Sequence, residues 1–540
     1  MQAQEARLPL TAAQHGLWSL QQLEPDNPFL VVGEFLDIRG AVDPYTFEAA
    51  VQQVVREAET LRVRVVVEDG DAFQIVMDDV HVSVPVVDLS SEPRAREVAE
   101  QKMRAMLTRP IDVTRELPFR FTLFKLSDEH YLHFHCFHHM VLDGWALGLV
   151  ARRMAEVYTA LATGRPCDAS PFGPLRTLLT TDEAYQESAE QRASAEFWKQ
   201  QLAGLPEPVR LSTGLPGIPG GVLRQALRLS DTASQRLRTL AQTIGVRGSS
   251  AALAAVSLYM QRVTGTEEIV LGLPVTARTE RTVRTVPGMT SNVVPLRLRP
   301  ESGASVAEVF RYVAEQTREV LPHQRYRYES LARDLKLIGT DRQLFGPNVN
   351  ILGFDYNLTF GTAPASGCNL AAGPTQDLGI IVVDRDNGEG WQIDFEANAD
   401  LYSADDIAGH LQRFVGFLET LAGSDPNSLV RELDILTQGE RELLGVWNDT
   451  AVEVPVGTVG EVFGRQADTT PDAVAVIGGE EQISYAELEA RANRLAHLLI
   501  EQGVGPERVV ALSMPRGIDM ITAVLGVLKA GGAYLPVDPT

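Results

Sequence analysis

Two adjacent histidines, His138 and His139, are the residues of this chain best suited to chemistry. They stand at the end of a strand-like apolar run, and the pair Asp143-Gly144 follows after three further residues. A neutral imidazole near pH 7 can take a proton from an amine while that amine attacks a carbonyl carbon. We therefore expect an enzyme that transfers an acyl group to a nucleophile without a metal or an organic cofactor, with His139 as the base.

Asp143 and Gly144 complete the group of candidate catalytic residues, together with His138. The sequence alone does not show whether Asp143 touches His139. A carboxylate at this spacing, across a strand–helix turn, more often enters an internal ion pair. Gly144 permits a backbone conformation that is closed to other residues, and it leaves room for a substrate.

Other interpretations of the histidines remain open. A lone histidine is more often a satisfied core or surface residue, but two adjacent ones followed by Asp-Gly-Trp favour a function. His133, His135 and His139 share one face of the expected strand, and His-x-His on a strand is a known ligand arrangement. We expect no metal, because no acidic or cysteine ligand shares this face of the expected strand with them. A serine or cysteine nucleophile is weaker still, since there is no Gly-x-Ser-x-Gly elbow and Cys136 lies within the strand.

The pattern around the histidines predicts a strand followed by a helix. Residues 131–139 alternate, so that odd-numbered positions share one face and even-numbered positions the other. A helix is expected from Trp145 to Thr163, with Gly164 as its C-cap. The other elements expected in this part are a helix that Asp43 caps and Pro44 begins, and strands at Leu61–Val67 and Phe119–Leu126.

The next part of the chain predicts a second set of helices and strands. A charged, helix-favouring segment (Asp182–Leu202) leads into a stretch rich in proline and glycine (Leu205–Gly221) that could connect two lobes. The elements expected beyond it are a buried helix at Ser249–Thr264 and strands at Glu268–Pro274 and Asn292–Leu298. Alternating strands and helices in both parts indicate α/β sandwiches.

Length and composition limit the function classes. With 540 residues the chain is too long for a single core. Its 71 acidic and 48 basic residues give a net charge of −23, which opposes nucleic acid or an anionic membrane as a partner. Three cysteines, far apart and without a C-x-x-C pair, fit a reducing cytoplasm. No apolar run approaches 18 residues, and the N-terminus has no signal-peptide core, so we expect a cytoplasmic protein.

The run from His138 to Gly144 resembles the H-H-x-x-x-D-G signature of condensation domains of non-ribosomal peptide synthetases. Further motifs in the family's order extend the resemblance over roughly residues 5–435. They are Leu10–Trp18, Glu59–Arg62, Pro274–Arg278, Gly288–Pro295, His323–Tyr326 and Leu344–Asn348.

The resemblance implies an α/β fold in which two lobes, each like chloramphenicol acetyltransferase, form a V-shaped pseudo-dimer. It divides the chain into a first lobe (1–175), a second lobe (176–435), a linker (436–456) and a further segment (457–540). It also implies amide-bond formation between two thioesters, one acyl and one aminoacyl. Upstream and downstream carrier proteins would bring them on 4'-phosphopantetheine arms, which are the only cofactor implied.

The resemblance also assigns residues around the histidines. It implies that Asp143 acts structurally, through an ion pair with Arg278. The residues expected to support the site are Arg278, Arg62 and Trp145, and those expected to line the substrate channel are Asn292, Ser291, Gly373 and Asp377.

Residues 457–540 resemble the start of an amino-acid adenylation domain, a partner in cis. Ile483–Leu488 and Leu528–Pro536 are similar to its first two motifs. The elements expected here are strands at Ala473–Ile477, Gln482–Tyr485, Arg508–Met514 and Ala533–Val537, and helices at Ala486–Gln502 and Gly517–Ala530. The glycine-rich phosphate loop of that family does not occur in this sequence, so we expect no adenylation activity from these 540 residues.

The chain departs from the family at two motif positions. Glu57-Ala58 stands where the family has Arg-His, and Ser291 stands where it has Phe. Leu344–Tyr356 and Gly373–Leu378 most resemble the condensation domain of enterobactin-type siderophore synthetases, whose donor is an aryl acid. We interpret the departures as signs of an unusual donor, an aryl or other non-amino-acid acyl group, with an ordinary aminoacyl or peptidyl donor as the alternative.

Related domains offer other functions. Epimerisation domains share the two histidines but do not usually continue Asp-Gly-Trp, and heterocyclisation domains replace the histidines by aspartates. A catalytically silent platform that recruits carriers or tailoring enzymes usually has a degraded motif. The motif here is whole, so we expect an active condensation domain.

Overall fold

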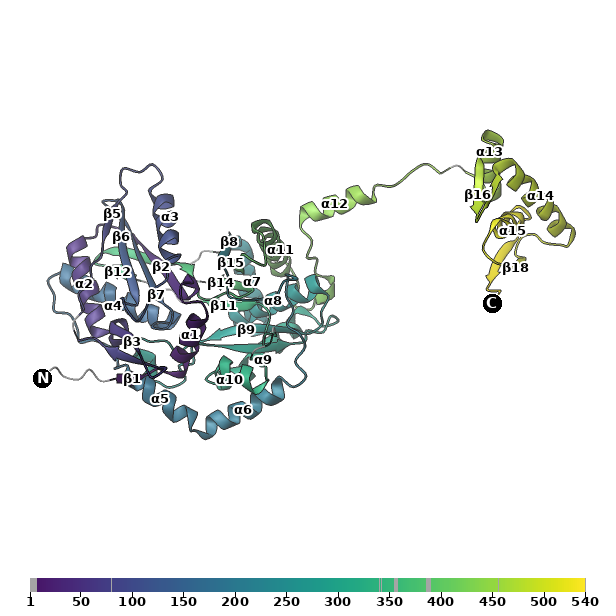
Figure 1. Ribbon diagram of the computed structural model, residues 1–540. Helices are drawn as coiled ribbons and strands as arrows, with labels where there is room; N and C mark the ends of the chain where they lie inside the picture. Colours follow the sequence, from purple (N-terminus) through teal and green to yellow (C-terminus); the bar gives the residue numbers. More distant parts are fainter. Residues whose placement is uncertain are drawn as a thin grey trace. The chain divides into compact units, whose positions relative to one another are not determined.

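The computed structural model describes residues 7–78, 80–338, 340, 342–353, 358–384, 390–454 and 456–539. The chain forms two compact units, Met1–Glu440 and Arg441–Thr540 (Figure 1). The first unit contains two lobes, each built on a six-stranded sheet with helices against it. The boundary between the units falls within helix α12 (Gln438–Asn448), so the predicted linker 436–456 is partly helical.

The sheet of the first lobe carries the histidine strand at its centre. Its order is β12-β13-β2-β7-β6-β5, and all neighbours are antiparallel except β5 and β6. The strands are β2 (Val31–Arg39), β5 (Val86–Asp88), β6 (Phe119–Ser127), β7 (His130–His138), β12 (Leu358–Phe360) and β13 (Ala363–Ala371). The predicted strands at β6 and β7 are thus confirmed to within one residue at each end.

Helices cover this sheet, and both of its faces are buried. Helices α2 (Pro44–Glu57) and α4 (Gly144–Ala162) pack with odd-numbered β7 residues such as Tyr131 and Phe137, while α3 (Ala95–Leu107) packs with even-numbered ones such as Phe134. The predicted two-faced alternation of β7 is therefore confirmed. The remaining elements of this lobe are α1 (Ala12–Leu23) and a small sheet of β1 (Arg7–Pro9), β4 (Asp71–Val76) and β3 (Val63–Glu68).

The second lobe has a mixed sheet of order β10-β9-β11-β14-β15-β8, in which β11 pairs in parallel with β9 and β14. The strands are β8 (Val222–Arg228), β9 (Ile269–Val275), β10 (Asn292–Leu298), β11 (Asn348–Leu352), β14 (Leu378–Val383) and β15 (Gln392–Asn398). Its helices are α7 (Asp231–Ile244), α8 (Gly248–Thr264), α9 (Val306–Val320), α10 (Tyr328–Asp334) and α11 (Ala404–Ala422).

The connection between the lobes is helical, as the helix-favouring segment Asp182–Leu202 predicted, but it is not one continuous helix. Two helices, α5 (Arg176–Gln186) and α6 (Ala189–Gln201), stand there. The chain breaks between them because the Ser188 side chain accepts a hydrogen bond from the Gln191 amide and so caps a new helix. Residues 205–221 then form neither helix nor strand, as the proline- and glycine-rich stretch predicted.

Two strands from the later part of the chain belong to the sheet of the first lobe. The predicted division of the lobes at residue 175 does not account for this exchange. Strands β12 and β13 follow the second-lobe strand β11 in the sequence but belong to the sheet of the first lobe. β13 pairs with β2, for example Gly367 with Leu36. The chain then returns to the second lobe at β14, so residues 372–377 cross between the two sheets.

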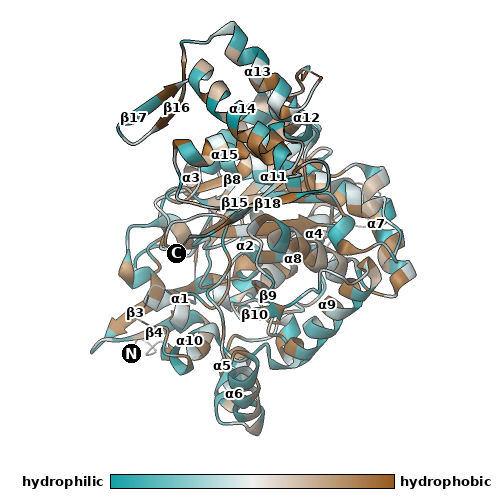
Figure 2. Ribbon diagram, turned by 90° about the vertical axis from the view of Figure 1, so that its right-hand side faces the viewer, coloured by the Kyte–Doolittle hydropathy of each residue, from teal (hydrophilic) through white to brown (hydrophobic). Residues whose placement is uncertain are grey.

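The second unit is a small α/β segment. Its elements are α13 (Val459–Thr469), β16 (Val474–Gly478), β17 (Glu481–Ser484), α14 (Tyr485–Glu501), β18 (Val509–Ser513), α15 (Ile518–Lys529) and β19 (Ala533–Val537). All six predicted elements are present to within two residues, and Figure 2 shows β16 as hydrophobic and its partner β17 as hydrophilic. In the part of the chain that the structure describes, no helix is both long and apolar enough to cross a membrane.

Candidate active site

A cavity of about 1180 Å³ lies between the two lobes of the first unit, with His139 in its wall. The first lobe contributes residues from α1, β2 and the start of α4, and the second lobe contributes residues from β9, β11, β14 and β15. The segment 371–377, which joins the two sheets, also lines the cavity. A reacting group at His139 would therefore be enclosed by both lobes.

The hydrogen bond that His139 makes determines which of its two ring nitrogens can accept a proton. Its Nδ1 lies 3.0 Å from the carbonyl oxygen of Leu142. Because a carbonyl only accepts, Nδ1 holds a proton and the neutral ring carries its lone pair on Nε2. Burial lowers the pKa of His139, although the Leu142 carbonyl and Asp143 act in the opposite direction. The ring is therefore neutral at pH 7, as a general base must be.

Gly373 lies directly against Nε2 of His139. A Cβ atom at residue 373 would stand 3.2 Å from both Nε2 and Cδ2 of the imidazole, and the backbone φ of +130° is one that other residues rarely adopt. The predicted channel residue Gly373 is thus beside the base, and the missing side chain keeps Nε2 accessible.

His138 has a different place from that of its neighbour. It is buried, and it is not among the residues that line the cavity. Its Nδ1 accepts a hydrogen bond from the Met140 amide, and its Nε2 lies 3.2 Å from Oε1 of Gln21. Burial lowers the pKa of His138 to about 3. This geometry supports a positioning role for His138, in place of the catalytic one suggested by the sequence.

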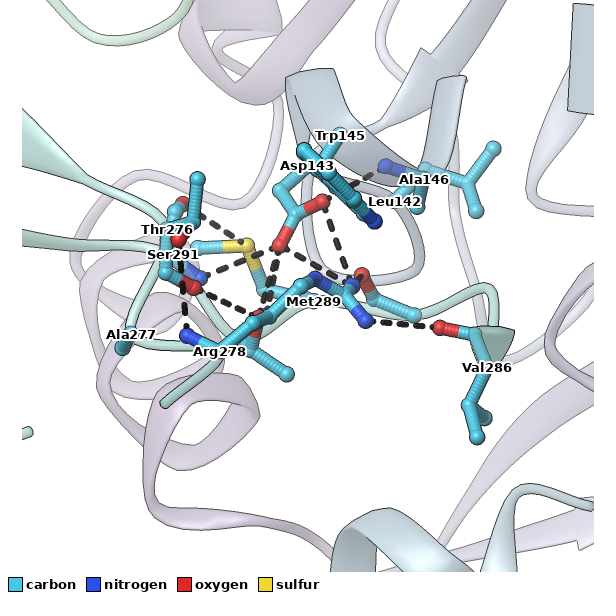
Figure 3. A network of polar contacts seen from close by, with 12 residues as sticks. Leu142, Asp143, Trp145, Ala146, Thr276, Ala277, Arg278, Val286, Met289 and Ser291 are labelled. Atoms are coloured by element: carbon cyan, nitrogen blue, oxygen red, sulfur yellow. Dashed lines mark hydrogen bonds and ion pairs between the residues drawn. The ribbon is translucent and has the colours of Figure 1, made fainter. Parts of the chain in front are cut away.

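The Asp143 carboxylate bonds the first lobe to the second lobe (Figure 3). The partner of His139 Nδ1 is instead the Leu142 carbonyl. Within its own lobe Asp143 caps α4 by accepting from the Ala146 amide at 2.8 Å. From the second lobe it accepts the amide and hydroxyl of Thr290 (3.0 Å each), the Ser291 amide (3.2 Å) and Nη2 of Arg278 (3.3 Å to each oxygen). The predicted Asp143–Arg278 ion pair is confirmed, and both side chains are about 1–2% exposed.

Arg278 and Trp145 extend this joint. The Arg278 guanidinium also donates to the carbonyl oxygens of Val283 (2.5 Å), Val286 (2.8 Å) and Gly288 (2.8 Å), and so holds the loop that follows β9. The indole of Trp145 donates to the Arg284 carbonyl at 3.0 Å and lines the cavity. Both residues therefore support the site, as predicted.

Gly144 lines the cavity, and only one of the two reasons predicted for a glycine at this position applies. It is the first residue of α4, and it is not among the glycines with positive φ, so no unusual backbone conformation is needed. A Cβ atom at this position would meet no atom within 4 Å. The structure retains the second predicted reason, room for a substrate.

The other predicted channel residues lie on the cavity wall, and most of their polar groups bond to the protein, although Oδ2 of Asp377 has no partner among the described residues. The Asn292 amide donates to the carbonyl oxygens of Gln324 (2.9 Å) and Tyr326 (2.8 Å). Asp377 accepts from the Tyr402 hydroxyl at 2.7 Å, and burial raises its pKa. Ser291 contributes its amide to Asp143. These residues shape the wall through contacts within the protein.

Arg62 does not reach the site. It donates to the Met77 carbonyl and is not among the cavity residues. The contact from this motif comes from Thr60, which sequence reasoning missed although it stands in the quoted motif. The buried Thr60 hydroxyl donates to the Val141 carbonyl at 2.8 Å, and so holds the loop between His139 and Asp143. Thr290 and Gln21 were missed as well, because nothing local in the sequence marks their partners.

The remaining histidines of β7 belong to the sheet rather than to a metal site. His130 binds Asp37 and His135 binds Glu34, each at 2.9 Å, and burial lowers the pKa of His133 well below its usual value. Within the described residues, no group of three or more histidine, cysteine or acidic side chains is placed to hold a metal ion. His139 lies outside this cluster, in the cavity wall.

Comparison with known families decides what kind of domain surrounds this cavity. The condensation-domain family model matches residues 4–445. The chain belongs to the condensation-domain family. The model of AMP-binding enzymes matches residues 463–540, in agreement with the adenylation motifs read from the sequence.

Individual relatives support the family and its fold. The chain is 37% identical over 531 residues to a dimodular non-ribosomal peptide synthase of Bacillus subtilis and 31% identical over 536 residues to enterobactin synthase component F of Escherichia coli. Both matches span 98% of this chain, but they span only 22% of the first relative and 41% of the second. The starter condensation domain of rhizomide synthetase, a mutant solved with C8-CoA and Leu-SNAC, matches 80% of this chain and 98% of its own at a TM-score of 0.75 and 32% identity. The predicted pair of acetyltransferase-like lobes is thereby confirmed.

Proposed function

We propose that residues 4–445 form an amide bond between an acyl thioester and the amine of an aminoacyl thioester, with His139 as the base. The observation that carries this proposal is the neutral His139, whose Nε2 faces a cavity enclosed by both lobes. The family membership and the intact motif support it.

The reaction would proceed with a balanced transfer of one proton. The amine nitrogen attacks the thioester carbon, a C–N bond forms, and Nε2 of His139 takes the proton that the nitrogen loses. The C–S bond then breaks, and the proton passes to the departing thiolate. Because Nδ1 donates to Leu142, the ring is held in the tautomer that accepts at Nε2.

Carrier proteins are the proposed partners, with substrates on 4'-phosphopantetheine arms. The cavity of about 1180 Å³ is lined by His139, by Arg39 and Arg96 of the first lobe and by Phe345 and Ile351 of the second. It therefore has room for two thioester-linked chains to approach the ring. Holding the two reactive ends together supplies a large share of the rate, since effective molarity can contribute several kcal/mol.

The proposed donor is an aryl or other non-amino-acid acyl group. Two segments, Leu344–Tyr356 and Gly373–Leu378, suggested this donor from the sequence. Phe345 of the first segment and all of the second line the cavity, while 354–356 lie outside the described residues. Six of the seven carboxylates in the described lining pair with an arginine or a histidine; they are Glu34, Asp37, Asp143, Glu329, Asp394 and Glu396. The seventh, Asp377, bonds to the Tyr402 hydroxyl, and its Oδ2 has no partner among the described residues. The rhizomide starter domain, a structural relative, holds an acyl-CoA.

The test is a competition between loaded carriers. Upstream carriers bearing hydroxybenzoyl, octanoyl and L-aminoacyl groups are mixed at equal concentration with one aminoacyl downstream carrier. The products are identified by intact-mass spectrometry, and the product ratio reads the ratio of kcat/KM values. Amide products from the first two carriers support the proposal. A preference for the aminoacyl donor contradicts the donor assignment, and the absence of any amide contradicts the function.

A further inference from the structure

Residues 372–377, which we call the strap, cross from the first sheet to the second beside His139. The strap begins after β13 and ends where β14 starts. Gly373 stands against the imidazole, and Pro374, whose ring fixes φ, follows it. The strap is short and close to the base, so a shift of its backbone would change both the space at Nε2 and the freedom of the ring.

The first end of the strap is fixed by a buried polar network that the reaction does not use. Arg224 of β8 binds Asp394 at 2.5 Å and Glu396 at 2.8 Å, both on β15. The same guanidinium donates to the Asn369 side chain at 3.0 Å, and Asn369 lies on β13, three residues before the strap. The second lobe therefore reaches across to the sheet of the first lobe at this point.

Glu396 acts on the strap through Arg224. Its carboxylate binds the same guanidinium that donates to Asn369, three residues before the strap. Burial raises the pKa of Glu396, while the charge of Arg224 acts in the opposite direction.

The other end of the strap is fixed as well. The Asn398 side chain donates to the Gln376 carbonyl at 3.0 Å, and the Asn398 amide donates to the Asp377 carbonyl at 2.9 Å. Asp377 accepts from the Tyr402 hydroxyl. With both ends bonded to β15 and its neighbours, the strap has one position relative to the second lobe.

We propose that Asn369, Glu396 and Arg224 are positioning residues for His139: they hold the strap so that Gly373 stays against the imidazole and keeps Nε2 in place. This inference rests on the proposed function only for its kinetic readout. A group displaced by about 1 Å from its reactive geometry can lose up to roughly a hundredfold in rate without losing substrate binding.

The first test uses two substitutions at the network and one control. Asn369→Ala removes the bond across the lobes and leaves the three charged residues together. Glu396→Ala removes one of the two carboxylates that hold Arg224, whereas Glu396→Gln keeps an acceptor oxygen. The control is Arg238→Met, which breaks a comparably buried ion pair with Asp384 in the same lobe but away from the cavity.

Kinetics with saturating carriers separates positioning from stability. Asn369→Ala and Glu396→Ala should lower kcat about tenfold with KM changed by less than about twofold, and Glu396→Gln should restore most of kcat. Arg238→Met should lower only the melting temperature. Unchanged kcat in folded Asn369→Ala, or equal kinetic losses in Arg238→Met, would overturn the proposal.

A second readout needs no product. Selective ¹³C labelling of histidine allows the pKa of His139 to be followed by NMR in each variant. If the strap shields the ring, this pKa should rise toward its ordinary value in Asn369→Ala and Glu396→Ala, and stay as in the wild type in Arg238→Met. An unchanged His139 pKa in both strap variants would overturn the proposal. If the His139 pKa rises in the strap variants but the wild-type protein forms no amide, the proposed function is refuted and the positioning role is retained.

Discussion

The two lobes meet on either side of His139 through two joints of opposite character. At the first, Asp143 accepts bonds from four residues, three of which, Thr290, Ser291 and Arg278, belong to the second lobe. At the second, the strap brings Gly373 to the imidazole with no side chain of its own. The first joint fixes the lobes by charge, and the second fixes the space at the base by close backbone approach. Removing the first should therefore affect stability and rate, and disturbing the second should affect mainly rate.

The largest effect is expected from Asp143→Ala. It leaves Arg278 buried without its carboxylate, which costs about 3–5 kcal/mol of unfolding free energy, and activity should be lost with the joint. Chemical denaturation measures the stability. Asp43→Ala is a matched control, because Asp43 caps α2 through the Thr46 amide but forms no ion pair with any residue that the structure describes, and should cost about 1 kcal/mol. Equal losses in the two variants would mean that the joint contributes no more than a helix cap.

Adjacent histidines allow the next contrast. His139→Ala should lower the rate by about 10²–10⁴-fold with little change in melting temperature, because the ring faces the cavity. His138→Ala should instead cost about 1–3 kcal/mol, since it removes the bonds to Gln21 and Met140. Product formation and thermal unfolding are measured side by side. A reversed pattern would exchange the roles assigned to the two residues.

Gly373→Ala tests the second joint. A methyl group 3.2 Å from Nε2, on a backbone that disfavours side chains, should lower kcat by about tenfold or more. Gly361→Ala is the control, since Gly361 also has positive φ (+65°) but its Cβ would meet only Tyr158, at 3.8 Å. Steady-state kinetics of both variants compares them. A similar fall in kcat for the control would assign the effect to backbone strain alone.

The sequence revealed the first joint much better than the second. The motif around Asp143 and its partner Arg278 are each contained in a continuous run of residues, so resemblance could pair them. The strap depends on the pairing of β13 with β2, for example Ala365 with Ile38, across more than three hundred residues. No local periodicity marks such a pairing, and Asn369 and Glu396 therefore carried no signal.

Errors within the motif have equally physical causes. His138 and His139 are chemically identical in sequence, and only their opposite directions from the end of β7 separate a buried ring from one in the cavity wall. Gly144 was assigned an unusual backbone, but it is an ordinary first residue of a helix. Arg62 was grouped with the site because its motif is, whereas its neighbour Thr60 makes the contact.

The dependence of stability on pH gives a further test of the role assigned to His138. Burial lowers the pKa of His138 to about 3, while the unfolded side chain titrates near 6.5. The unfolded state therefore binds the proton first, and stability falls as the pH drops from about 6.5 toward 3, by at most about 1.4 kcal/mol per pH unit for this residue. His138→Gln should flatten this decline in denaturation curves at several pH values. An unchanged slope would place the titration elsewhere.

The pH dependence of kcat/KM for amide formation tests the central claim most directly, since it reports the ionisation of the base in the free enzyme. Burial lowers the pKa of His139, so the acid limb of the rate should be centred below pH 6.5, and His139→Ala should lack this limb. An acid limb centred above pH 6.5, or the same limb in His139→Ala, would contradict a neutral His139 as the base.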